Sequence, residues 1–264
     1  MRALLLTSTL LLLSACGGAT SPANPGPPPP VQTVAHTLSG QVLDPAGQPV
    51  AGAEVWIQPV SYQGLIKART DAQGRYRSTE LNPAQAPYEA QAYKTLTYHG
   101  EQYCVRMGGE TEADFDVFNP QSGSVRNFRW KTSGRAEGGY DNLTWGGTLS
   151  LYTDPDTSQE DTLWNDEVIE VTLVPNGPLL DGSAGETLTY RTRIVDQISD
   201  VPVGQYDISA QVVNEDGTRS PLRLKADNSV QKIPFAPSIT FLFDGLTNCG
   251  HYATFHTTPL AVSR

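Results

Sequence analysis

Residues 37–60 read TLSGQVLDPAGQPVAGAEVWIQPV, and residues 68–81 continue as ARTDAQGRYRSTEL. Apolar side chains at every second position predict short strands in both segments, including one over residues 53–60. Two tight turns, residues 44–47 (DPAG) and 71–74 (DAQG), interrupt them. Proline presets φ in such a turn, and glycine closes it without steric cost. The stretch therefore predicts a series of antiparallel strands joined by tight turns.

This stretch closely resembles the carboxypeptidase regulatory-like domain, a transthyretin-like (prealbumin-like) β-sandwich. The matching residues are Gly40, Val42, Asp44, Gly47, Pro49, Val50, Gly52, Ala53, Val55, Thr70, Asp71, Gly74, Tyr76, Ala92 and Tyr93. The resemblance implies a sandwich with a carbohydrate-binding-like fold, which in that family is an accessory domain to a zinc peptidase. We place the domain at residues 37–133, with its last strand at 127–133 after an insertion at 94–125.

Period-two patterns continue through the second half of the chain. In EVIEVTLVP, Ile169, Val171 and Leu173 share one face, and in YDISAQVV the apolar and polar side chains alternate in the same way. Further candidate strands are GGTLSLY, ETLTYRTRIV, LRLKA and ITFLF. No stretch keeps a helical period with caps over three turns, so an all-β fold is expected. We predict a second β-sandwich domain at residues 134–264.

The N-terminus has the layout of a secretory signal peptide at residues 1–15: one basic residue, an apolar run, then small residues before Cys16. The run is too short to span a bilayer as a helix. Leu13-Ser14-Ala15-Cys16 resembles the lipobox of bacterial lipoproteins, in which the cysteine is acylated and becomes the mature N-terminus. The resemblance implies lipidation of Cys16 and a place at the outer membrane or cell surface. An ordinary signal cleavage nearby is the alternative. Residues 16–36 contain a proline run and predict an extended tether.

The acidic balance of the chain, 28 acidic against 18 basic residues, excludes nucleic acid as an expected partner because phosphate binding needs a basic surface. Besides Cys16, the chain has only Cys104 and Cys249. In an oxidising compartment these two could form a disulfide closing a loop of about 145 residues. Two separate thiols are the alternative.

The sequence offers no recognised catalytic or cofactor motif. The histidines at 36, 99, 251 and 256 lie in no zinc-ligand frame, and neither a G-x-S-x-G elbow nor a phosphate-binding loop is present. The acidic segment at residues 152–167 begins like a calcium-binding EF-hand loop but lacks the required glycine and the final glutamate. A solvated loop is the favoured interpretation, and a calcium site of another type is the alternative. We expect no enzyme activity, no cofactor and no metal.

Trp56 is the candidate ligand platform. Since Val55 and Ile57 face inward in the predicted strand, Trp56 lies on the opposite face with Glu54 and Gln58. An aromatic ring with polar neighbours suits a saccharide, although coverage by the predicted insertion or by the second domain would make Trp56 ordinary packing. We expect a lipid-anchored, non-catalytic cell-envelope protein with a structural or protein-interaction role. Carbohydrate binding to envelope or extracellular glycans is the alternative.

Overall fold

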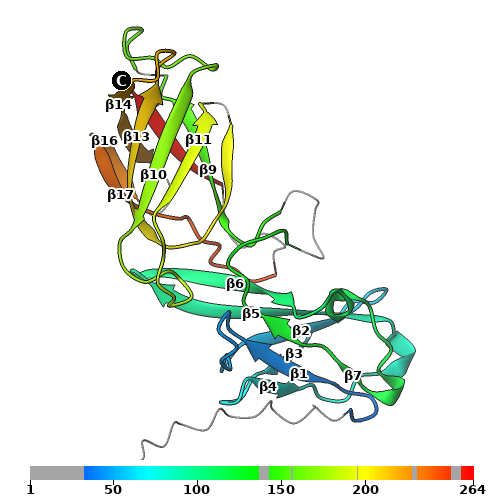
Figure 1. Cartoon of the computed structure of the whole chain (residues 1–264). Helices are drawn as coiled ribbons and strands as arrows, with labels where there is room; N and C mark the ends of the chain where they lie inside the picture. Colours follow the sequence, from blue (N-terminus) through cyan, green and yellow to red (C-terminus); the bar gives the residue numbers. More distant parts are fainter. Residues whose placement is uncertain (1–32, 137–142, 156, 195, 228–230, 251–256) are drawn as a thin grey trace, which may run out of the picture. The chain divides into compact units, whose positions relative to one another are not determined.

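The computed structural model describes residues 33–136, 143–155, 157–194, 196–227, 231–250 and 257–264 (Figure 1). Residues 31–264 belong to one compact unit. The described chain is built from strands and three short 3₁₀ turns, so the expected all-β class is confirmed. Within the described residues, no helix has the length and apolar character needed to cross a membrane.

The first eight strands form one hydrogen-bonded path in the order β3-β2-β5-β6-β8-β1-β4, with β7 paired to β1. One end of the path contributes Val55, Ile57 and Ala92 to the core, and the other contributes Leu38, Val42 and Tyr76. The strands are β1 (Leu38–Leu43), β2 (Glu54–Pro59), β3 (Ile66–Arg69), β4 (Arg75–Arg77), β5 (Tyr88–Tyr98), β6 (Glu101–Gly109), β7 (Ser124–Val125) and β8 (Phe128–Arg129).

Both predicted turns form as expected. The Gly47 N–H donates to the Asp44 carbonyl over 3.0 Å, and the Gly74 N–H donates to the Asp71 carbonyl over 3.0 Å. Gly74 has φ of 69°, and a Cβ there would lie 2.5 Å from the carbonyl oxygen of Val42. A left-handed backbone and this close approach both require glycine, so the turn sequence directly fixes how β3 leads into β4.

The predicted insertion at 94–125 is wrong in its first half. β5 continues to Tyr98, and β6 pairs with it in an antiparallel register from Tyr98↔Glu101 to Ala92↔Met107. Most of β6 is buried on both faces, which removes the alternation that marks a half-buried strand. The expected last strand at 127–133 shrinks to β8, which bridges β6 and β1.

The second half forms two five-stranded sheets, in which β11-β10-β13-β14 with β17 make one and β12-β9-β18-β15-β16 make the other. The expected inward residues Ile169, Val171 and Leu173 are all completely buried. The strands are β9 (Gly147–Thr153), β10 (Val168–Pro175), β11 (Leu188–Arg193), β12 (Gln197–Val201), β13 (Gln205–Val213), β14 (Arg219–Pro221), β15 (Arg223–Asp227), β16 (Lys232–Ala236), β17 (Ser238–Leu242) and β18 (Thr257–Ser263).

Candidate functional site

Trp56 lies on the outward face of β2, where the alternation predicts it, but neighbouring side chains contact its ring. Lys67 of β3 places its ammonium 4.2 Å from the ring centroid. From β5, Tyr93 approaches with its ring centroid at 5.0 Å and an interplanar angle of 54°. The indole is only partly exposed. It is therefore part of a packed cluster rather than an open surface for a ligand.

Glu54 holds this cluster together electrostatically. Its carboxylate accepts hydrogen bonds from the indole N–H of Trp56 at 3.1 Å, from Lys67 at 3.2 Å and from Arg69 at 3.0 Å. The Trp56 bond, followed by those from Arg69 and Lys67, lowers the pKa of Glu54 to about 2. Three donors on one carboxylate favour its charged form, so Glu54 is ionised throughout the physiological range.

A small pocket of about 110 Å³ remains beside the indole, lined by Trp56, Gln58, Glu89, Gln91, Tyr93 and Gly250. Gly250 belongs to the second half of the chain, and a Cβ on it would lie 3.0 Å from the Trp56 ring. Ligand pockets are typically several times larger. The structure thus brings Trp56 and Gln58 together around this pocket, with the Glu54 carboxylate bonded to the indole, but leaves little room for a sugar ring.

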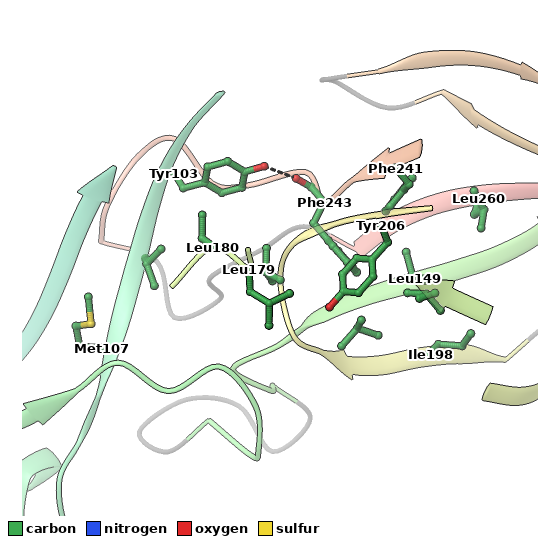
Figure 2. Packing of buried hydrophobic residues seen from close by; sticks show 14 of the residues in the cluster. Tyr103, Met107, Leu149, Leu179, Leu180, Ile198, Tyr206, Phe241, Phe243 and Leu260 are labelled. Carbon is green, nitrogen blue, oxygen red and sulfur yellow. Dashed lines mark hydrogen bonds between the residues drawn. The ribbon is translucent and has the colours of Figure 1, made fainter. Parts of the chain in front are cut away.

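Gly250 reaches Trp56 because the β5–β6 hairpin contacts the second half of the chain. We call this set of contacts the junction: β5–β6 on one side, and residues 178, 205 and 243–250 on the other. In Figure 2 the Tyr103 side chain of β6 points toward Phe243, and its hydroxyl donates to the Phe243 carbonyl over 2.8 Å. Burial raises the pKa of the Tyr103 phenol, so the group remains a proton donor.

The backbone around Tyr103 fits closely. The Cys104 N–H donates to the Leu246 carbonyl over 2.7 Å, which extends main-chain bonding from β6 to the other side of the junction. A Cβ on Gly245 would lie 2.1 Å from the Tyr103 ring. Only glycine lets the chain pass this close to a completely buried ring.

Tyr98, at the end of β5, makes a second polar contact across the junction. Its hydroxyl donates to the Pro178 carbonyl over 2.8 Å and accepts from the Gln205 N–H over 2.9 Å. One side chain therefore satisfies two backbone groups of the second sandwich, which fixes its position relative to β5.

A covalent bond closes the junction. Cys104 and Cys249 form a disulfide with their Cα atoms 5.3 Å apart, a separation within the usual range. Because Cys104 also lies in β6, next to Tyr103, the crosslink and the hydrogen bonds act on the same strand.

A further contact joins β6 to the segment that leads into β9. Arg106 is almost completely buried, and its guanidinium carbon lies 5.3 Å from the Trp145 ring centroid and 5.7 Å from that of Phe115. A buried guanidinium between two aromatic rings is stabilised by cation–π interactions. Arg106 did not stand out in the sequence, because nothing local marks an arginine in a strand as buried.

The other sequence candidates do not converge on a site. Asp154 is buried and forms an ion pair with Lys225, so it is not a free ligand of a calcium loop. His36 lies 3.3 Å from Glu80, His99 packs edge-on to Tyr98, and both His251 and His256 lie outside the described residues. The described residues contain no group of three metal-ligating side chains. Cys16 also lies outside the described residues.

The remaining tryptophans differ widely in exposure. Trp145 is buried, and Trp130 packs against the core. Trp164, in the connection between β9 and β10, is 69% exposed. Trp164 could not be singled out from the sequence, because a tryptophan in an irregular acidic segment has no periodicity from which its exposure can be predicted.

Comparison with known families and structures supports the domain expected from the sequence. The model of the carboxypeptidase regulatory-like domain matches residues 37–118, which confirms the resemblance and includes β6 within the domain. A search of curated proteins found no match.

Three solved structures share low similarity with the chain. They are the Bacillus anthracis TIE protein (11% identity, TM-score 0.33, 85% of this chain and 32% of that one), a streptococcal ancillary pilin (11%, 0.24, 84% and 61%) and a DUF3823 family protein from Bacteroides uniformis (12%, 0.23, 79% and 99%). The chain spans less than two thirds of the length of the first two.

Proposed function

We propose that this chain, whose residues 37–118 form a carboxypeptidase regulatory-like domain, is a non-catalytic structural protein of the bacterial cell envelope. In this proposal a lipid on Cys16 holds it to the membrane. The two sandwiches act as one rigid spacer that presents a surface to an envelope protein.

The junction is the observation that carries this proposal. A hinged pair of domains would meet through few contacts, and relative motion is the default for domains joined by a linker. Here one hairpin contributes a disulfide, a main-chain hydrogen bond and three hydrogen bonds of two tyrosine hydroxyls to the neighbouring sandwich. Such a connection keeps the two sandwiches in a fixed arrangement under force, which suits a spacer.

The contacts around Trp56 favour this role over saccharide binding at the same residue. Lys67, Tyr93 and Gly250 all approach the indole, and Glu54 accepts its N–H. A sugar stacking on Trp56 would have to displace at least one of these groups.

Metabolic labelling of the full chain with an alkyne fatty acid in a Gram-negative host tests the anchor. We expect label on the wild-type chain and its recovery in washed membranes, with both lost in Cys16→Ser. A labelled Cys16→Ser chain would contradict the anchor.

Limited trypsin digestion of the same membranes tests the spacer. We expect one fragment that contains both sandwiches, even after reduction of the digested sample, because a rigid junction limits the local unfolding on which proteolysis depends. Early cleavage between the sandwiches would contradict the rigid arrangement.

A further inference from the structure

Trp164 borders an open hollow on the second sandwich. The hollow has a volume of about 970 Å³ and is lined by Leu151, Tyr152, Thr153, Thr162, Leu163, Trp164, Asn165, Asp166 and Ile194. We call it the Trp164 hollow. Its floor is apolar, because Leu151, Leu163 and Ile194 are each at most 3% exposed. Its rim carries the indole and several polar side chains.

The backbone at Trp164 is held in place although its side chain is exposed. The Trp164 N–H donates to the Glu167 carboxylate over 2.7 Å, and the Glu167 N–H donates back to the Trp164 carbonyl over 3.1 Å. Glu167 is in turn paired with Arg264, whose own N–H bonds to the Asp161 carbonyl. The turn that carries the indole is thus held by hydrogen bonds and an ion pair. Less backbone entropy is lost when a ligand binds against the indole.

Hydrogen-bonding groups at the rim are available to a ligand. Four polar groups at the rim have no hydrogen-bond partner among the described residues. They are the Trp164 indole N–H, the Asn165 amide, the Asp166 carboxylate and the Tyr152 hydroxyl. Together they supply both donors and acceptors around a flat aromatic ring. A saccharide matches this arrangement, because it presents apolar C–H faces for stacking and hydroxyls at its edge.

Charge restricts the class of saccharide. Asp166 is the one charged side chain among the described residues that line the hollow. The nearby cations Lys225 and Arg264 are each paired with a carboxylate, Asp154 and Glu167 respectively. An acidic sugar would meet repulsion from Asp166, and the described residues that line the hollow supply no cation to offset it.

We propose that the Trp164 hollow binds a neutral oligosaccharide, which stacks on Trp164 and bonds to Asn165, Asp166 and Tyr152. The volume exceeds that of the pocket at Trp56 almost ninefold, which leaves room for more than one sugar ring. This site is independent of the spacer role, since its residues lie outside the junction.

Calorimetric titration of the full chain, kept in a detergent without a sugar headgroup, tests the site. The probes are cellohexaose, maltohexaose and N-acetylchitohexaose, with hexagalacturonate as the acidic comparison. We expect saturable binding of at least one neutral hexasaccharide and at least tenfold weaker binding of hexagalacturonate. Trp164→Ala should weaken the neutral ligand at least tenfold, whereas Trp164→Phe should keep part of the affinity.

Tyr62→Ala is the matched control, because Tyr62 is 54% exposed but lies in the first sandwich. It should bind like the wild type. In the wild-type chain, the bound sugar should also reduce acrylamide quenching of tryptophan fluorescence, a readout that needs no variant. Absence of binding to all three neutral probes, or binding that Trp164→Ala leaves unchanged, would overturn the proposal.

Discussion

At the residue scale, Glu54 and Trp56 lie on the predicted outward face of β2, but they form a packed cluster and not the expected ligand platform. The period of β2 places both outward, as expected. Which groups then contact the indole depends on β3 and β5, because the register sets Trp56 opposite Lys67 on one side and Gln91 on the other. Register between distant segments cannot be read from the period of one strand.

The lowered pKa of Glu54 leads to a pH-dependent stability. Its folded pKa of about 2 lies below the ordinary value of 4.5, so the carboxylate stabilises the fold above pH 4.5 and this contribution is lost as the pH falls toward 2. We expect the melting temperature of the wild type to exceed that of Glu54→Gln at pH 6 and the difference to vanish near pH 2. The effect should be small, because one third of the side chain is exposed and solvent screens it.

Glu89→Gln is the control for this measurement. Glu89 lies on the same face, beside Gln58, but has no ion-pair or hydrogen-bond partner among the described residues. Thermal melts of the three proteins from pH 2 to 7 make the comparison. A constant difference between the wild type and Glu54→Gln across that range would show that the charge of Glu54 is not the cause.

At the element scale, prediction succeeded for two tight turns and failed for the second strand of the β5–β6 hairpin. The turns at Asp44–Gly47 and Asp71–Gly74 were predictable because each depends on hydrogen bonds between residues close in sequence. β6 was not, because burial on both faces and the glycines at 108 and 109 hide its strand pattern. β18 was also missed. Its Pro259 argues against a strand that is hydrogen-bonded on both sides, because proline has no N–H to donate.

Pro259 is tolerated for a reason visible only in the sheet. β18 pairs with β9 from Thr257 to Val262, but its pairing with β15 covers only Ala261–Ser263. At Pro259 only β9 pairs with β18, so a residue without an N–H is tolerated on the side where β15 does not reach. Trp164 and the Trp164 hollow were also not predictable. The exposure of a side chain in a connection between strands depends on how the surrounding strands are arranged, which one segment of sequence does not show.

Tyr98→Phe tests the polar contact at the tip of the hairpin. The substitution removes the hydroxyl that bonds to both the Pro178 carbonyl and the Gln205 N–H, so we expect a loss of about 1–2 kcal/mol in the free energy of unfolding. Amide hydrogen exchange at Gln205 should become faster, while exchange within β10 stays unchanged.

Tyr62→Phe provides the comparison for Tyr98→Phe, since the hydroxyl of Tyr62 has no partner among the described residues. It should leave the free energy of unfolding and the Gln205 exchange rate unaltered. Equal exchange rates at Gln205 in Tyr98→Phe and the wild type would mean that the contact does not hold the junction in solution.

At the scale of the whole molecule, the Cys104–Cys249 disulfide makes the two sandwiches depend on each other. The bond spans 145 residues of sequence, and on the chain-entropy model a loop of this size gives about 5 kcal/mol of stabilisation. We expect calorimetry of the full chain in a Cys16→Ser background to show one unfolding transition when oxidised. The double variant Cys104→Ser and Cys249→Ser should melt at lower temperature, with two separable transitions.

The Cys16→Ser background prevents exchange with a third thiol. Reduction of the parent protein with dithiothreitol should reproduce the melting profile of the double serine variant, which separates loss of the crosslink from effects of the serines. If the oxidised and reduced proteins melted alike, the hydrogen bonds of the junction alone would account for the coupling.

The order of strands in the last sheet also governs when the protein can fold. β18 pairs in parallel with β9 from Thr257↔Thr148 onward and lies between β9 and β15, so the sheet has a gap at its centre until residues 257–263 are available. Pairing between segments so far apart makes folding slow, because a long loop must close before its contacts stabilise the fold. During synthesis the second sandwich therefore stays incomplete until β18 has been made. Until then its other strands lack a complete sheet, and such an unfolded segment can pass through a pore that is too narrow for the finished sandwich.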